Sequence, residues 1–304
     1  MTAPGRGSSV ERTIRGLFDD AGVRGWLHVA AVHRPEAQVV IDADARLPMG
    51  SIYKVPVMVA FCRLADAGLL DPARRLTLHP RDRVPGPTGI SVLHDAVTMS
   101  LRDLVVLMMT ISDNTAADAV LHAVGADVVD AMCQDLGLPA TRIHGGVVNT
   151  FSRLLADTGA ASLDAALAQV TDNDTVAPDG VYDPAYKASS TPAELARLLR
   201  AIWTDQAASA ERCAFMRTVM RRQPWAHRLG SGFPYDDVIV SGKTGSFGAL
   251  RHEAGVVELA DGSTYTAVVF TQAARADTKL PRADAVIGAA ARAAVEALQG
   301  RRET

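Results

Sequence analysis

The chain has 304 residues, of which 48% are hydrophobic and 21% are charged, and this composition is typical of a globular protein with a sizeable core. Its net charge is −3 at pH 7 and its basic residues are scattered, which argues against a nucleic-acid-binding surface. No apolar stretch is long enough to cross a bilayer. Cys62, Cys133 and Cys213 are few and widely spaced, so they exclude a disulfide framework and indicate buried thiols.

The eight histidines are dispersed and show no metal-ligand spacing. We therefore expect no metal and no cofactor, no nucleic-acid or membrane partner, and a small molecule as the substrate. Residues 1–10 contain no apolar signal core, and this predicts a cytoplasmic protein. The composition leaves the oligomeric state open.

The predicted elements separate strands near the two chain ends from helices in the middle. In chain order we expect a helix over 10–21, a hairpin over 26–31 and 38–41, helices over 51–70, 101–109 and 115–136, a short helix over 162–170 inside an enlarged loop at 157–190, a helix over 192–204, strands over 238–241, 254–259 and 265–271, and a closing helix over 284–299. A sheet built from both chain ends, with a helical lobe between them, is therefore the predicted arrangement.

Ser51 and Lys54 stand three residues apart at the start of a long apolar run. On a helix this spacing places both side chains on one face, and Pro56 fits an early helical turn. A serine hydroxyl is a weak nucleophile until a base removes its proton. A buried lysine loses its proton more easily than an exposed one, so Lys54 is the candidate base. For this pair alone, a helix-capping serine followed by a surface lysine is the alternative.

A second polar group, Ser112-Asp113-Asn114, lies between two predicted helices. The Ser112 hydroxyl can relay a proton between lysines and a leaving group, and the Asn114 amide can donate to a substrate carbonyl. The alternative is a polar turn that caps the second helix.

A third group, Lys243-Thr244-Gly245-Ser246, follows a run of β-branched residues that predicts a strand. Lys243 and Thr244 offer a charge and a hydroxyl to a substrate carboxylate. Gly245 lets a substrate backbone lie against the strand edge. The N–H groups of Ser51 and Ser246 are the natural pair for an oxyanion hole. The alternative for this group is a strand that ends in a turn.

In chain order the three groups spell S-x-x-K, S-D-N and K-T-G, the set found in class A β-lactamases and penicillin-binding proteins. The chain resembles a class A serine β-lactamase over most of its length, including residues 89–95 and 136–142. The resemblance implies an acyl-enzyme on Ser51, with Lys54, Ser112 and Lys243 as the catalytic group. It also implies a basic residue after Gly245 that holds a substrate carboxylate. Arg251 is the candidate, and a surface arginine is the alternative.

The resemblance also implies the fold class, an α+β (α/β) two-lobe protein of β-lactamase type. An α/β lobe, about 1–50 and 215–304, would hold an antiparallel sheet flanked by terminal helices. An all-α lobe would cover about 51–214. Together they would form a single catalytic domain over 1–304.

One position departs from the family pattern. The family places a glutamate shortly after its Thr-Arg segment, where the carboxylate activates the deacylating water. Here Val147 stands at that place, and no glutamate occurs between Glu36 and Glu194. Valine cannot abstract a proton. Asn149 is a candidate for part of the polar role and His144 is a candidate base, with a hydrogen-bonded loop histidine as the alternative.

These observations favour a β-lactamase-like serine hydrolase or acyltransferase that acts on an ester, amide or lactam carbonyl and hydrolyses β-lactams inefficiently. Three alternatives stay open: a true class A-type β-lactamase with a relocated deacylation base, a non-turnover penicillin-binding sensor, and a glutaminase. The enlarged loop at 157–190 would reshape the pocket or act as a lid, with an ordinary solvated loop as the alternative.

Overall fold

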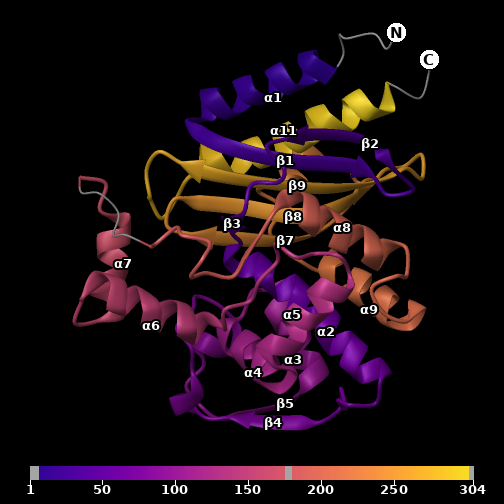
Figure 1. Ribbon diagram of the computed structural model, residues 1–304. Coiled ribbons are helices and arrows are strands. Elements are labelled where there is room, and N and C mark those ends of the chain that lie inside the picture. Colours follow the sequence, from indigo (N-terminus) through magenta and orange to yellow (C-terminus); the bar gives the residue numbers. More distant parts are fainter. Residues whose placement is uncertain (1–6, 175–179, 301–304) are drawn as a thin grey trace.

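The computed structural model describes residues 7–174 and 180–300. Its centre is a five-stranded antiparallel sheet in the order β2-β1-β9-β8-β7 (Figure 1). The strands are β1 (Val23–Ala31), β2 (Arg34–Ile41), β7 (Ile239–Phe247), β8 (Leu250–Glu258) and β9 (Thr264–Ala273). β1 pairs with β9, so the strands of this sheet that come first and last along the chain are hydrogen-bonded neighbours. Both chain ends therefore build one sheet, as predicted.

Two terminal helices cover the outer face of the sheet. α1 (Gly7–Ala21) and α11 (Pro281–Gln299) lie side by side across it in Figure 1. Their apolar faces share one core with the outward side chains of the strands, including Ile14, Leu27, Val269 and Ile287. Because the other face of the sheet is also covered, the central strands are buried on both sides, and β8 is buried along almost its whole length.

The inner face of the sheet packs on helices. α8 (Pro192–Trp203) and α9 (Ala210–Arg221) lie between it and a helical lobe made of α2 (Lys54–Asp66), α3 (Leu101–Thr110), α4 (Asn114–Val124) and α5 (Ala126–Asp135). One continuous core joins inward sheet residues such as Phe270 to α2 residues such as Phe61. The shorter elements are β3 (Leu47–Pro48), β4 (Arg75–Leu78), β5 (Val97–Ser100), β6 (Ser189–Ser190) and α10 (Leu229–Gly232).

The structure corrects three sequence predictions. The helix expected over 115–136 is two helices, because Gly125 adopts φ 91° and ψ 129°, which ends α4 and begins α5. The strand expected over 238–241 is longer: β7 continues through the Lys-Thr-Gly segment to Phe247, so the alternative of a strand that ends in a turn at this segment is wrong. A helix, α6 (Val147–Thr158), occupies a stretch for which no helix was predicted. The first N–H groups of α6 donate to the side chain of Asp118, which is distant in the sequence, so the local pattern alone did not reveal this helix.

The enlarged loop is a small helical insertion with its own core. α7 (Leu163–Thr171) matches the short helix expected there, and it packs against α6 through Leu154, Ala166 and Val170. Tyr182 attaches the insertion to the sheet, since its Oη accepts a hydrogen bond from the Ala249 N–H at 2.9 Å. No helix of the described residues is both long and apolar enough to cross a membrane.

Replacing Gly125 tests how the helical lobe turns between α4 and α5. Gly125→Ala should lower the free energy of unfolding by about 1–3 kcal/mol, because only glycine adopts this backbone conformation without strain. Gly16→Ala is the control: Gly16 lies in α1 with open space around it, and alanine there should raise stability by up to about 1 kcal/mol. Urea unfolding of both variants measures the difference. A Gly125→Ala protein as stable as the wild type would contradict this prediction.

Candidate active site

Ser51 lies where the start of α2 touches the edge strand β7. It belongs to a 3-10 turn, Gly50–Tyr53, that leads directly into α2. Gly50 has φ 52°, and a Cβ added there would come within 3.0 Å of the Ser246 backbone nitrogen. At Gly245 an added Cβ would lie 2.4 Å from the Met49 carbonyl oxygen. The two glycines therefore let the serine turn and the strand approach each other backbone to backbone.

Lys54 is fully buried and makes three hydrogen bonds. Its Nζ donates to the Ser112 carbonyl at 2.8 Å, to the Ser112 Oγ at 3.2 Å and to the Asn114 Oδ1 at 3.0 Å. Burial lowers the pKa of Lys54 to about 7, although the charges of Asp113 and Asp118 oppose the shift. The amine therefore has a substantial neutral fraction near neutral pH.

Lys243 approaches the same hydroxyl from β7. Its Nζ donates to the Ser112 Oγ at 3.0 Å and to the Thr244 carbonyl at 2.8 Å, and its side chain is fully buried. Burial and the neighbouring Lys54 charge hold the pKa of Lys243 well below its usual range. Ser112 Oγ thus lies between two buried amines, one from α2 and one from β7.

The turn that carries Ser112 is held by its neighbour Asp113. Ser112 has φ 59°, which is uncommon for a residue with a side chain. Asp113 is completely buried and its carboxylate accepts from the N–H groups of Ile90 at 2.6 Å and Ala116 at 3.2 Å, so it also caps α4. Asn114 is equally engaged, because its Nδ2 donates to the Pro85 carbonyl at 2.8 Å.

Arg228 stabilises the end of β7 by hydrogen bonds to Gly245 and Ser246, and no sequence pattern predicted this role. Its Nη1 donates to the carbonyls of Gly245 and His252 at 2.9 and 2.7 Å, and its Nη2 to the Ser246 Oγ at 2.6 Å. Its Nε contacts Asp284 Oδ1 at 2.7 Å. Arg228 stands in an irregular segment whose sequence gives no periodic or motif signal. Only the folded chain brings this buried guanidinium to the Lys-Thr-Gly strand.

Arg251 does not reach the pocket that contains Ser51. Its guanidinium donates to the carbonyls of Gly248 at 2.7 Å, Leu250 at 2.8 Å and Asp277 at 2.8 Å, and its side chain is buried. These contacts tie the β7–β8 turn to the segment before α11. The expectation that Arg251 binds a substrate carboxylate is therefore corrected: its donors are already occupied by backbone oxygens. Thr244 is held in place, since its N–H donates to Gln223 Oε1 at 2.8 Å.

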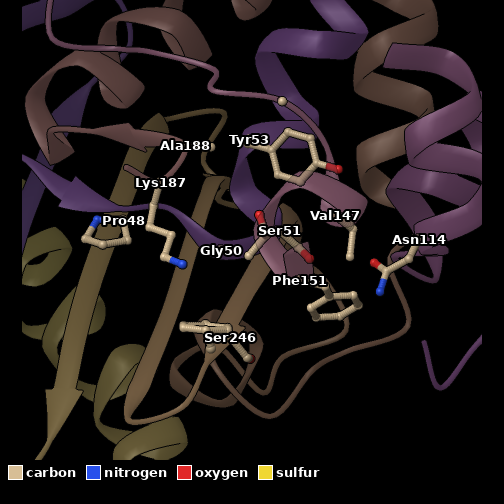
Figure 2. A pocket seen from close by; sticks show the side chains of 13 residues that line it. Pro48, Gly50, Ser51, Tyr53, Asn114, Val147, Phe151, Lys187, Ala188 and Ser246 are labelled. Atoms are coloured by element: carbon tan, nitrogen blue, oxygen red, sulfur yellow. The ribbon is translucent and has the colours of Figure 1, made fainter. Parts of the chain in front are cut away.

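The Ser51 side chain faces a pocket with a cavity volume of about 120 Å³ (Figure 2). Its lining is mostly apolar and comes from the serine turn, α6, the segment before β6 and the end of β7: Pro48, Gly50, Ser51, Tyr53, Asn114, Gly145, Val147, Thr150, Phe151, Lys187, Ala188, Ser246 and Phe247. No carboxylate is among these residues.

The α6 wall of the pocket carries no base, since its lining residues are Val147, Thr150 and Phe151. Val147 and Phe151 face the Ser51 pocket (Figure 2). His144 and Asn149 are exposed and line neighbouring hollows instead. Asn149 Oδ1 accepts from the Gly146 N–H at 3.2 Å, so its polar group serves the start of α6. The structure therefore does not bring either candidate to Ser51.

Asp118, which the sequence did not single out, anchors this wall. Its two carboxylate oxygens accept from the N–H groups of Val147 at 2.7 Å and Val148 at 2.9 Å. These are the first N–H groups of α6, which have no partner within the helix. Burial raises the pKa of Asp118, and the two backbone hydrogen bonds oppose the shift. A carboxylate of α4 thus fixes α6 beside Ser51.

Comparison with known proteins identifies the family. Residues 9–298 match the model of the beta-lactamase enzyme family. The beta-lactamase regulatory protein BlaB of Streptomyces cacaoi is 28% identical over 304 residues, which cover 93% of this chain and 96% of that protein. The β-lactamase of Sphaerobacter thermophilus DSM 20745 superposes with a TM-score of 0.76 at 25% identity, over 96% of this chain and 97% of that one.

PBP-A shares the fold with the same TM-score, 0.76, at 20% identity, over 98% of this chain and 97% of that one. The predicted fold class, a mixed α and β protein with an antiparallel sheet, is confirmed by these neighbours. The family match extends over nearly the whole length and includes both the sheet and the helical lobe. This chain therefore belongs to the β-lactamase enzyme family, the β-lactamase-like serine hydrolases.

Proposed function

We propose that this protein is a serine hydrolase or acyltransferase that forms an acyl-enzyme on Ser51 and releases the acyl group slowly to water. The observation that carries the proposal is the Ser112 hydroxyl held between two buried amines beside the Ser51 turn. Acylation needs a base and a proton relay, and both are present there. Efficient deacylation by water needs a carboxylate or similar base beside the ester, and the α6 wall offers Val147, Thr150 and Phe151, none of which is a base.

In acylation the neutral amine of Lys54 removes the proton from Ser51 Oγ, which attacks the carbonyl carbon of an ester, amide or lactam. The lowered pKa of Lys54 supports this role, because a base must be unprotonated near the working pH. The negative charge on the carbonyl oxygen is held by the N–H groups of Ser51 and Ser246. The close approach of Gly50 to Ser246 supports this pairing.

Collapse of the tetrahedral intermediate breaks the bond to the leaving group, which takes a proton from Ser112 Oγ. Ser112 regains a proton from the Lys54 ammonium, 3.2 Å away. Lys243, at 3.0 Å from the same oxygen, stabilises negative charge that develops there during transfer. Asn114 contacts Lys54 and lines the pocket, so it is suited to hold both the base and the acyl group.

The structure gives less support to an efficient β-lactamase with a relocated base. His144 and Asn149 line other hollows, and the residues that line the Ser51 pocket include no carboxylate or histidine. An acceptor amine or alcohol could take the acyl group in place of water, as in a transacylase. The acceptor would then bring its own nucleophile into the pocket.

A second candidate function is a sensor that Ser51 acylation switches on and that turns over little. The observation that favours it is the similarity to the Streptomyces cacaoi regulatory protein along nearly the full length of both chains. Both candidates share the acylation step. They differ in the lifetime of the acyl-enzyme, which intact-protein mass spectrometry measures.

The first test is the acylation of Ser51. After mixing with a chromogenic cephalosporin or a small activated ester, wild-type protein should gain the mass of the acyl group, and Ser51→Ala should not. The adduct should persist for minutes or longer, because no carboxylate lines the pocket to activate water. Ser112→Ala should acylate at least tenfold more slowly. Full product formation by Ser51→Ala would contradict the proposal.

The pH dependence of acylation tests Lys54. Only the neutral amine acts as a base, so the rate should rise about tenfold per pH unit below the pKa and level off above about 7. Stopped-flow measurement of acylation between pH 5 and 9 gives the profile. Lys54→Arg, which stays charged across this range, should lose acylation at all pH values. A wild-type rate that is constant from pH 5 to 9 would exclude this role.

Restoring a carboxylate on α6 tests the slow step. Val147→Glu should speed deacylation by about 10²-fold or more, because the new side chain lies in the Ser51 pocket and can activate water. Val147→Gln, with the same shape and no charge, is the matched control and should leave the adduct stable. The decay of the acylated mass over time is the readout. Equal decay in both variants would show that the missing carboxylate does not limit deacylation.

A further inference from the structure

Lys187 enters the Ser51 pocket from a segment that is firmly held. The neighbouring Ala188 carbonyl accepts from the Met49 N–H at 2.8 Å, and Ser189 in β6 pairs with Pro48 in β3. The backbone of Lys187 is thereby fixed to the strand just before the Ser51 turn. Figure 2 shows its side chain extending toward the space between Pro48 and Ser246.

The amine of Lys187 has no hydrogen-bond or ion-pair partner among the described residues. Its Nζ is buried and makes no hydrogen bond, and the residue as a whole is 5% exposed. Its one charge-directed contact there is a cation–π contact with the Phe247 ring, whose centroid is 5.5 Å from the Nζ. An unpaired ammonium in such surroundings is costly, and burial accordingly lowers the pKa of Lys187. The protein thus keeps an unsatisfied cation at the wall of its pocket.

The carboxylate of Asp157, whose charge acts on Lys187, is engaged elsewhere through Oδ1, while its Oδ2 is buried without a hydrogen-bond partner. Asp157 Oδ1 pairs with Arg153 Nε at 2.7 Å, and Arg153 in turn lies over the Tyr186 ring. No ion pair joins Lys187 to Asp157 in the described part of the chain. Of the side chains that line the pocket, Lys187 is the one that carries a formal charge. An anionic ligand in the pocket would therefore meet a positive charge that no side chain of the lining neutralises.

The position of Lys187 indicates which part of the substrate it contacts, the acyl group or the leaving group. The leaving group departs toward Ser112 and Lys243, which do not line the pocket. The pocket is therefore left for the acyl chain, between the apolar α6 wall and Lys187. We propose that Lys187 determines specificity by binding a carboxylate at the end of the acyl chain, so that the preferred substrate is an acyl donor with an anionic acyl group. This proposal rests on the proposed function and adds the substrate class.

Binding without acylation gives the first test, in the Ser51→Ala protein. Monomethyl succinate, which ends in a carboxylate, should bind at least tenfold more tightly than methyl butyrate, its neutral analogue, as followed by NMR titration. Lys187→Met in the same background should abolish that preference. Lys187→Arg should keep much of it. Lys279→Met, which removes an exposed lysine, is the matched control and should change nothing.

Acylation gives the second test. Wild type should be acylated at least tenfold faster by the 4-nitrophenyl half-ester of succinate than by 4-nitrophenyl butyrate, and Lys187→Met should lose only the faster reaction. Equal slowing with both esters would overturn the proposal and make Lys187 a base. If neither ester acylates wild type, the proposed function fails, while the binding preference still decides the role of Lys187.

Thermal unfolding separates a ligand site from a structural role. Without ligand, Lys187→Met should be as stable as wild type or more stable, because it removes a desolvated amine that has no partner. Asp157→Asn should leave the preference for the anionic ester unchanged. Loss of stability in Lys187→Met, together with loss of the preference in Asp157→Asn, would instead assign Lys187 to an ion pair and overturn the proposal.

Discussion

Two buried lysines share one serine hydroxyl in this protein, and the rest of the architecture depends on that arrangement. Lys54 and Lys243 are both fully buried, and both donate to Ser112 Oγ. Two ammonium groups so close together, away from water, repel each other and favour the loss of a proton from one. Lys54 lies in α2, Ser112 in the α3–α4 turn and Lys243 in β7. These three elements must therefore be held rigidly against the repulsion between the two amines.

The rigidity comes from buried charged groups outside the lysine pair. Asp113 caps α4 and accepts from the Ile90 N–H, which fixes the turn that carries Ser112. In β8, the strand paired with β7, Glu253 accepts from the Leu229 N–H and from the Gln223 Nε2, each at 2.8 Å. Arg228 binds the carbonyl of Gly245 from the same side. These three buried charged groups, Asp113, Glu253 and Arg228, are thus paired, and this is the condition under which buried charge is tolerated.

The α6 wall of the pocket differs from the side that carries the two lysines. α6 is anchored by Asp118 and packs with α7 in a small separate core, so the pocket meets Val147 and Phe151 and not a carboxylate. Under the proposed function, a site built in this way combines strong activation of the serine with weak activation of water, which suits a transferase or a sensor better than an efficient hydrolase. Lys187, the one formal charge on the pocket lining, is then the residue proposed to select the acyl group.

The sequence by itself determined the family, the division into strands near both chain ends and helices in the middle, and the motifs around the hydroxyl. Ser51, Lys54, Ser112 and Lys243 stand in motifs whose local spacing carries the signal, and the resemblance that these motifs support implies the place of the terminal helices on the sheet. The break at Gly125 escaped prediction, because apolar residues continue on both sides of it.

Only the tertiary structure decided how the distant polar residues are used. Arg228, Asp118 and Lys187 lie outside any motif, and their roles arise from contacts across long stretches of sequence. Arg251 shows the converse. Its place after Gly245 suggests a substrate-binding residue, but its N–H groups donate to backbone carbonyls. The physical reason is that burial and hydrogen-bond partners belong to the folded chain, and these decide whether a charged side chain serves the scaffold or faces a ligand.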